Sequence, residues 1–170
     1  RLLLGQANPS AKLPFTVPRD PSQLPAFDNR SLAVEYGYYH GYTLLEKQGS
    51  EPRYAFGHGL SYTTFAYANL ALDRKQTPAA GVVTASVDVT NTGSRAGEEI
   101  AQLYVGFESS ALDRPLKLLR GFEKLALAPG ETKRIGMPVP VADLAYYDAA
   151  SGRWAVERMP HTVLVGPSSR

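Results

Sequence analysis

Few acidic side chains in this sequence are spaced so that two of them could act on one bond. The one adjacent pair of carboxylates is Glu98-Glu99, and paired carboxyl groups are what cleavage of a glycosidic bond requires. The alternation of apolar and polar residues around the pair predicts a strand, on which neighbouring side chains point to opposite faces. We therefore interpret Glu98 and Glu99 as the solvated entry of a strand and not as catalysts.

The other acidic and histidine candidates also have structural explanations. Asp143 fits a position in a short helix, and Asp148 fits a hairpin turn. His40, His58 and His161 lack the spacing of a helical zinc site, and the two glycines that flank His58 favour a sharp backbone path over a general base. Neither a nucleotide-binding glycine loop nor a nucleophile elbow occurs. We expect no catalytic, cofactor-binding or metal-binding residue in this chain.

Aromatic residues offer a different chemistry, because flat rings can pack against the C–H face of a sugar. Tyr36–Tyr42 is a dense, glycine-punctuated run of tyrosines that fits either a sugar-stacking surface or an interdomain packing surface, and we favour packing. Trp154 alternates with Val156 on a short predicted strand, so we expect it to be a core ring.

Composition excludes several classes of protein. The chain has 170 residues, 44% of them hydrophobic, a net charge of +2 and no cysteine. Disorder throughout, non-specific nucleic-acid binding, disulfide frameworks and thiol chemistry are therefore excluded. No apolar run approaches the roughly 20 residues that a membrane helix needs. We expect a soluble protein with neither nucleic acid nor membrane as a partner, and the composition leaves its compartment open.

The elements that must position these residues are strands. Period-two alternation is clearest at residues 83–90 and resumes at 101–107, and the turn chemistry of Asn91-Thr92-Gly93-Ser94 predicts that these two segments pair. No helical pattern of 10–15 residues separates the strands, which favours an all-β antiparallel sandwich of about seven strands. The other predicted strands are Phe65–Asp73, Leu118–Leu127, Thr132–Val139, Arg153–Val156 and Thr162–Val165, and one helical turn is predicted at Val141–Leu144.

The first third of the chain has a different character. Five prolines within residues 1–25 exclude a helix there and allow only a short strand at Lys12–Val17. Leu2-Leu3-Leu4-Gly5 fits the last turn of a helix with its glycine stop, so we interpret Arg1 as lying inside a longer polypeptide. Residues 27–67 are expected to form loops and short strands that pack against something large.

Several short motifs occur along the chain in a particular order and spacing. They are Leu4-Gly5, Asn8–Thr16, Tyr39–Tyr42, Phe56–Thr63, Asn91–Gly93, Gln102–Val105, Leu119–Lys124, Pro129–Thr132 and Val165-Gly166. Together they resemble the C-terminal part of family 3 glycoside hydrolases, and the resemblance covers nearly the whole chain. The chain departs from the family at Ala11, where the pattern has glycine, and at residues 159–162.

The resemblance implies a division of the chain and a missing catalytic centre. Residues 1–25 resemble the end of an α/β sandwich domain, 26–64 a Tyr/Gly-rich connector and 65–170 an immunoglobulin-like, fibronectin type III-like β-sandwich. The family carries its aspartate nucleophile and its acid/base in upstream domains. A further strand normally follows the position of Arg170, so the sandwich is expected to lack an edge.

We therefore expect a non-catalytic structural module of a β-glucosidase-like parent, a retaining hydrolase of terminal β-linked sugars. Its partners would be the α/β sandwich and barrel domains of that parent, and a periplasmic or secreted location is compatible with the resemblance. The alternative is a carbohydrate-binding β-sandwich that holds an oligo- or polysaccharide on Tyr38 and Tyr39 without cleaving it.

Overall fold

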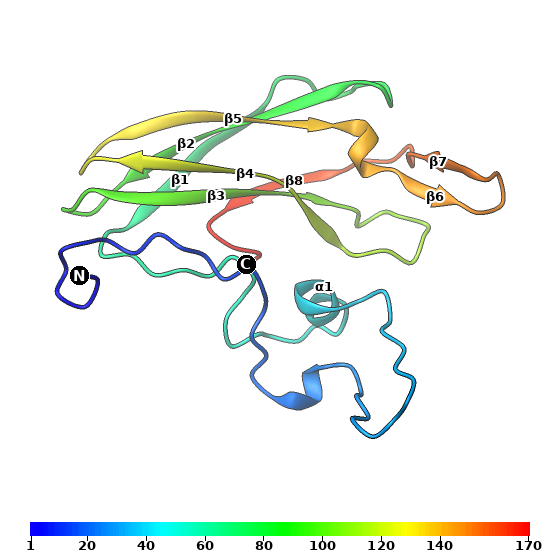
Figure 1. Cartoon of the computed structure of the whole chain (residues 1–170). Coiled ribbons are helices and arrows are strands. Elements are labelled where there is room, and N and C mark those ends of the chain that lie inside the picture. The colour runs from blue at the N-terminus through cyan, green and yellow to red at the C-terminus, as the bar shows by residue number, and fades with distance from the viewer.

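Eight strands, one α-helix and two short 3-10 helices follow one another along the chain (Figure 1). The computed structural model describes all 170 residues. None of its helices is both long enough and apolar enough to cross a bilayer. The elements are η1 (Pro21–Gln23), α1 (Gly41–Lys47), β1 (Phe65–Leu72), β2 (Val82–Asn91), β3 (Gly97–Gly106), β4 (Lys117–Leu127), β5 (Thr132–Pro140), η2 (Val141–Leu144), β6 (Tyr146–Asp148), β7 (Arg153–Ala155) and β8 (Thr162–Gly166).

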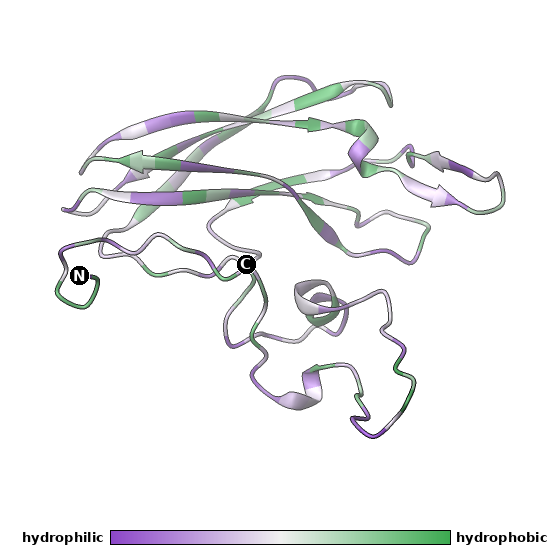
Figure 2. Cartoon of the chain, in the orientation of Figure 1, coloured by the Kyte–Doolittle hydropathy of each residue, from purple (hydrophilic) through white to green (hydrophobic).

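The long strands form two three-stranded sheets that face each other. Their orders are β1-β2-β5 and β4-β3-β8, and every pair is antiparallel. Hydrophobic and hydrophilic residues alternate along these strands in Figure 2, as expected where one face of a strand meets the core. The predicted all-β antiparallel sandwich is therefore confirmed.

The core lies between the two sheets and is built from alternate residues of β2, β3, β4 and β5. Leu103 on β3 is completely buried and lies at the centre of this set. The twelve core residues are Ala85, Val87, Val89, Ala101, Leu103, Val105, Phe107, Leu125, Leu127, Met137, Val139 and Leu144.

The predicted pairing of residues 83–90 with residues 101–107 is wrong. β2 pairs with β1 and β5, whereas β3 pairs with β4 and β8, so the chain changes sheets between Asn91 and Gly97. The buried amide of Asn91 explains the change, because its Nδ2 donates to the carbonyls of Arg95 and Leu127 while its Oδ1 accepts from Thr63 Oγ1 and Gly93 N. These four bonds hold the connection across the end of the sandwich, where a hairpin turn would have kept both strands in one sheet.

Residues 1–64 lie below the β4-β3-β8 sheet (Figure 1). The strand predicted at Lys12–Val17 is absent, and only an isolated bridge joins Val17 to Tyr54. The helix α1 was not predicted, because its glycine, tyrosine and threonine are weak helix formers. The expected glycine stop is present: Gly5 has a φ of 67°, its N–H donates to Leu2, and the Gln6 N–H donates to Arg1, which is the Schellman pattern.

The hairpin β6-β7 projects from one end of the sandwich (Figure 1). The expectation that Trp154 is a core ring is wrong, because this side chain is 71% exposed. It pairs across the hairpin with Tyr147, at a ring distance of 5.7 Å. Near this end, a cavity of about 1030 Å³ opens between the sheets and reaches inward to Ala85 and Val105.

Leu103 and Leu164 provide a matched test of the core. Leu103→Ala is expected to lower the free energy of unfolding by about 2–5 kcal/mol, because the deletion leaves a cavity between the sheets. Leu164 is 40% exposed on the neighbouring strand. Leu164→Ala should therefore lower the free energy of unfolding by less than about 1 kcal/mol. Equal losses in urea unfolding curves would contradict this placement of the core.

Candidate functional site: the face formed by residues 1–64

The outer face of β3 is buried, although it points away from the sandwich core. Gln102 and Tyr104 are only 3% and 2% exposed, because residues 1–64 and the end of the chain cover them. Tyr104 Oη donates to Gln102 Oε1 at 2.6 Å, and Gln102 Nε2 donates to the carbonyls of Gly57 and Pro167. The ring of Tyr42 on α1 lies edge-on against Tyr104, with centroids 6.0 Å apart. This polar and aromatic contact joins the first third of the chain to the sheet.

Gly57 allows the backbone to approach β3 this closely. It has a φ of 81°, and a Cβ atom placed there would lie 2.2 Å from Gln102 Oε1. Any larger residue would both strain the backbone and displace the Gln102 amide. The Phe-Gly-His-Gly motif is thus a sharp backbone path, and His58 packs its ring against Tyr54 at 5.0 Å.

Glu99 is buried in an ion pair and is not the solvated residue that we expected. It lies on the core-facing side of β3 and is only 4% exposed. Lys12 Nζ contacts its Oε1 at 2.8 Å, and Tyr67 Oη donates to the same oxygen at 2.9 Å. Burial raises the pKa of Tyr67, and the adjacent carboxylate raises it further, so the phenol stays protonated and remains a donor.

Glu98 points to the opposite side of the strand, as predicted. Its Oε2 lies 2.7 Å from Lys124 Nζ and accepts a hydrogen bond from Ser10 Oγ. These two partners hold the pKa of Glu98 below its usual range. Each glutamate of the pair is therefore neutralised by its own lysine, and each contacts residues 10–12 of the N-terminal segment.

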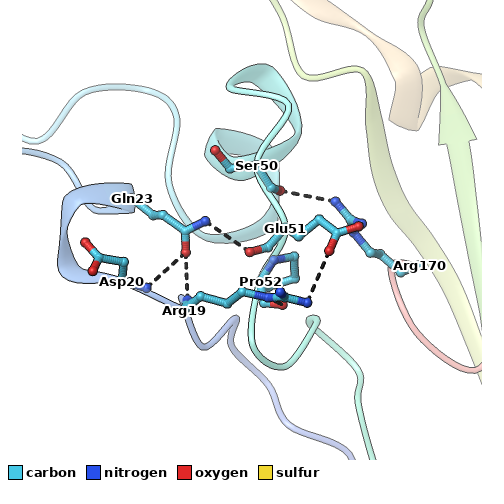
Figure 3. Close-up of polar contacts among 7 residues, drawn as sticks. All are labelled: Arg19, Asp20, Gln23, Ser50, Glu51, Pro52 and Arg170. Atoms are coloured by element: carbon cyan, nitrogen blue, oxygen red, sulfur yellow. Dashed lines mark hydrogen bonds and ion pairs between the residues drawn. The ribbon is translucent and has the colours of Figure 1, made fainter.

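A polar clamp ties three distant parts of the chain together (Figure 3). The Glu51 carboxylate accepts from Arg19 Nη2 at 3.1 Å and from Arg170 Nη1 at 3.3 Å. Gln23 Nε2 donates to the Glu51 carbonyl, and Arg170 Nη2 donates to the carbonyl of Ser50. The clamp fixes η1 and the segment after α1 to the last residue, and its exposed ion pairs contribute more to position than to stability.

The tyrosine run splits into residues that bind the sandwich and residues that face outward. Tyr39 Oη donates to Asp113 at 2.6 Å, and Lys47 Nζ lies 3.7 Å from the centroid of the Tyr39 ring. Tyr36 and Tyr38 are 73% and 65% exposed. The run therefore does not form one continuous platform.

Exposed apolar side chains are concentrated in residues 1–64. Thirteen of the twenty-one large hydrophobic residues that are exposed belong to this segment. Leu45, at 3% exposed, is the segment's only buried hydrophobic side chain. Such a concentration is typical of a surface that contacts another domain or protein. We call the part of this surface that lies in the 24–38 loop the apolar face, and its residues are Leu24, Phe27, Leu32, Val34, Tyr36 and Tyr38.

The remaining predicted residues are dispersed. Asp143 is exposed on η2, and Asp148 holds the β6-β7 turn by accepting from Ala150 N and Ser151 Oγ. His40 precedes α1, and His161 packs edge-on against Phe107, where burial lowers the pKa of the imidazole. No group of three His, Asp or Glu side chains could hold a metal ion.

The adjacent glutamates provide a second matched test. Glu99→Gln is expected to lower the free energy of unfolding by about 3–5 kcal/mol, because it leaves the charge of Lys12 buried without a partner. Glu98→Gln should change it by less than about 1 kcal/mol, because the lost pair is exposed. Guanidinium unfolding of both variants measures the difference, and a larger loss for Glu98→Gln would show that the buried pair is not the stronger contact.

Two known domains match this chain. Residues 1–62 match the glycosyl hydrolase family 3 C-terminal domain, and residues 99–169 match the fibronectin type III-like domain. The first match covers the segment beneath the sheet, and the second covers β3 through β8.

Relatives match over almost the full chain. Thermostable beta-glucosidase B of Acetivibrio thermocellus is 42% identical over 99% of this chain and 23% of its own length. The crystal structure of a beta-D-glucoside glucohydrolase from Trichoderma reesei has a TM-score of 0.89 at 35% identity, and the chain covers 26% of it. Beta-glucosidase 3B from Thermotoga neapolitana, solved with α-D-glucose, has a TM-score of 0.86 at 37% identity, with 24% of its length covered.

The chain thus spans about a quarter of the length of these relatives. Its two domain matches follow one another in the order that the motifs predicted, and its fold superposes on the solved β-glucosidases throughout. This chain belongs to the family 3 glycoside hydrolases, of which it is the C-terminal region with a fibronectin type III-like domain.

Proposed function

We propose that this chain is a non-catalytic module that stabilises a β-glucosidase-like parent by docking onto its other domains. In this proposal residues 1–25 complete an α/β sandwich domain, residues 26–64 form the connector, and residues 65–170 are the supporting β-sandwich. The parent hydrolyses terminal β-linked sugars with retention, through two carboxyl groups that its other domains supply.

The observation that carries this proposal is the apolar face. Its six side chains are exposed although they lie in a segment that is otherwise fastened to the sheet by Gln102, Lys12 and the Glu51 clamp. A surface that is fixed in place and apolar is suited to a permanent contact. The relatives are about four times longer than this chain, which leaves ample polypeptide to cover it.

The state of the carboxylates supports a non-catalytic role. A retaining glycosidase needs two carboxyl groups about 5 Å apart that both face one substrate. Glu98 and Glu99 face opposite sides of β3, and each is paired with a lysine. Neither side chain is free to attack or protonate a sugar.

Docking through the apolar face can be measured with the remainder of the parent, expressed as a separate polypeptide from the coding sequence upstream of Arg1. We expect the two parts to associate, and Tyr36→Ser to raise the dissociation constant at least tenfold, because about 1.5–3 kcal/mol of ring burial is lost. Tyr147→Ser is the matched control, since Tyr147 is 56% exposed on the distant β6-β7 hairpin.

Two results would contradict the proposal. One is that the wild-type chain does not associate with the upstream polypeptide, or that Tyr36→Ser and Tyr147→Ser weaken the association equally. The other is turnover of an aryl β-glucoside by the isolated chain at enzyme-like rates, abolished by substitution of Glu98 or Asp148.

The exposed pair Tyr147 and Trp154 favours a second candidate function, the binding of a saccharide without cleavage. The two rings meet edge to face, at an interplanar angle of 70°, on a projecting hairpin. Both are more than half exposed, so each offers part of a flat ring surface on which a sugar could stack.

In this second case the chain would be retained on insoluble β-glucan, and Trp154→Ala would abolish the retention. Phe122→Ala is the control, because Phe122 is 66% exposed but has no aromatic neighbour. Passage of the wild-type chain through a glucan column without delay would exclude this function.

A further inference from the structure

Arg120 occupies a break in the regular pairing of β4. Leu103 lies opposite Gly121 and Tyr104 lies opposite Leu119, so Arg120 is the one residue of this stretch without a partner on β3. Such a bulge redirects the side chain that it carries. Next to it, the Leu119 N–H donates to Tyr42 Oη at 3.1 Å, so α1 holds the bulge in place.

The redirected guanidinium lines a surface hollow and has no partner. The hollow has a volume of about 460 Å³ and is lined by Leu119, Arg120, Gly121, Phe122 and Asp143. Arg120 forms no ion pair within 4 Å, and none of the hydrogen bonds in the chain reaches its side chain. The carboxylate of Asp143, which lines the same hollow, attracts the guanidinium from beyond that distance. Its Nε atom is buried and unsatisfied.

Arg114 shows what the chain does with a comparable arginine. Its side chain is 8% exposed, its Nη1 lies 3.2 Å from Glu157 Oε2, its Nη2 donates to the Leu144 carbonyl, and its guanidinium lies 3.6 Å from the centroid of the Phe107 ring. A desolvated guanidinium is costly unless a carboxylate compensates its charge. Burial also lowers the pKa of Arg120, and the attraction of Asp143 offsets this effect only in part.

We propose that Arg120 is the receptor for a carboxylate side chain that the parent enzyme contributes from outside these 170 residues. The carboxylate enters the hollow and forms a bidentate ion pair with the guanidinium, which is the geometry that arginine favours. This pair fixes the register of the docked module, while the apolar face supplies most of the contact area.

Two features identify an acidic side chain of the parent as the occupant. The first is the guanidinium itself, since Arg120 forms no ion pair even with Asp143 in the same lining, and Phe122 and Leu119 form the apolar rim of the hollow. The second is continuity, because Leu119 in the rim is hydrogen-bonded to Tyr42, which follows closely after the 24–38 loop that carries the apolar face. The relatives are about four times longer than the chain, so the parent has other domains that could supply this carboxylate. The inference rests on the proposed docking function.

The test is whether Arg120→Met stabilises the isolated chain but weakens its association with the rest of the parent. In the isolated chain, Arg120→Met should raise the midpoint of thermal unfolding by about 2–4 °C, because it removes a partly buried charge that forms no ion pair. The matched control Arg114→Met should lower the midpoint, because it leaves Glu157 buried without its partner. In the association assay with the upstream polypeptide, Arg120→Met should raise the dissociation constant at least tenfold and Arg120→Lys by a smaller factor.

Each outcome bears on the inference. If Arg120→Met lowers the midpoint of the isolated chain, Arg120 supports the fold itself and the inference is wrong. If the wild-type chain associates and Arg120→Met associates equally well, the inference fails and the docking function stands. If the wild-type chain does not associate, both fail together. Free acetate can also be added to the isolated wild-type chain. If acetate raises its midpoint to that of Arg120→Met, and Arg120→Met does not change association, then Arg120 binds a small anion only and the inference is wrong.

Discussion

The structure depends on β3 being covered on both of its faces. One face carries Ala101, Leu103 and Val105 into the core between the sheets, and the other carries Gln102 and Tyr104 against residues 1–64. A strand buried on both sides fixes whatever lies beside it, because neither face can move without exposing apolar or unpaired polar atoms. The segment below the sheet has only Leu45 as a fully buried hydrophobic side chain, so it takes its order from β3.

Charge is used in two ways on this scaffold. The Lys12 and Glu99 pair is buried and joins the N-terminal segment to the rim of the core, whereas the pairs around Glu51 are exposed and close the clamp. A buried pair is intolerant of losing either partner, while an exposed pair adds little free energy. The buried pair therefore fastens the N-terminal segment to the sheet, and the exposed pairs around Glu51 set its lateral position.

Most strands were predictable because alternation and turn residues are local signals. The predictions that were wrong concern features that depend on a partner distant in sequence. The pairing of β2 with β3 failed because strands of facing sheets alternate in the same way, and only the buried amide of Asn91 directs the chain across. Glu99 and Trp154 were misplaced because burial at a strand entry or on a hairpin is decided by whether Lys12 or another segment covers the position. The apolar face could not be predicted in detail, since Tyr39, which binds Asp113, and the tyrosines that face outward share one run.

The clamp in Figure 3 has a consequence for how the chain is made. Glu51 and Arg170 are 119 positions apart, and at ribosomal speeds of about 5–20 residues per second roughly 6–24 s separate their synthesis. During that interval residues 1–64 have no sheet to order them. Their exposed leucines and aromatic rings therefore leave the ribosome before the strand that positions the segment, and a holding chaperone would have its longest opportunity to bind there.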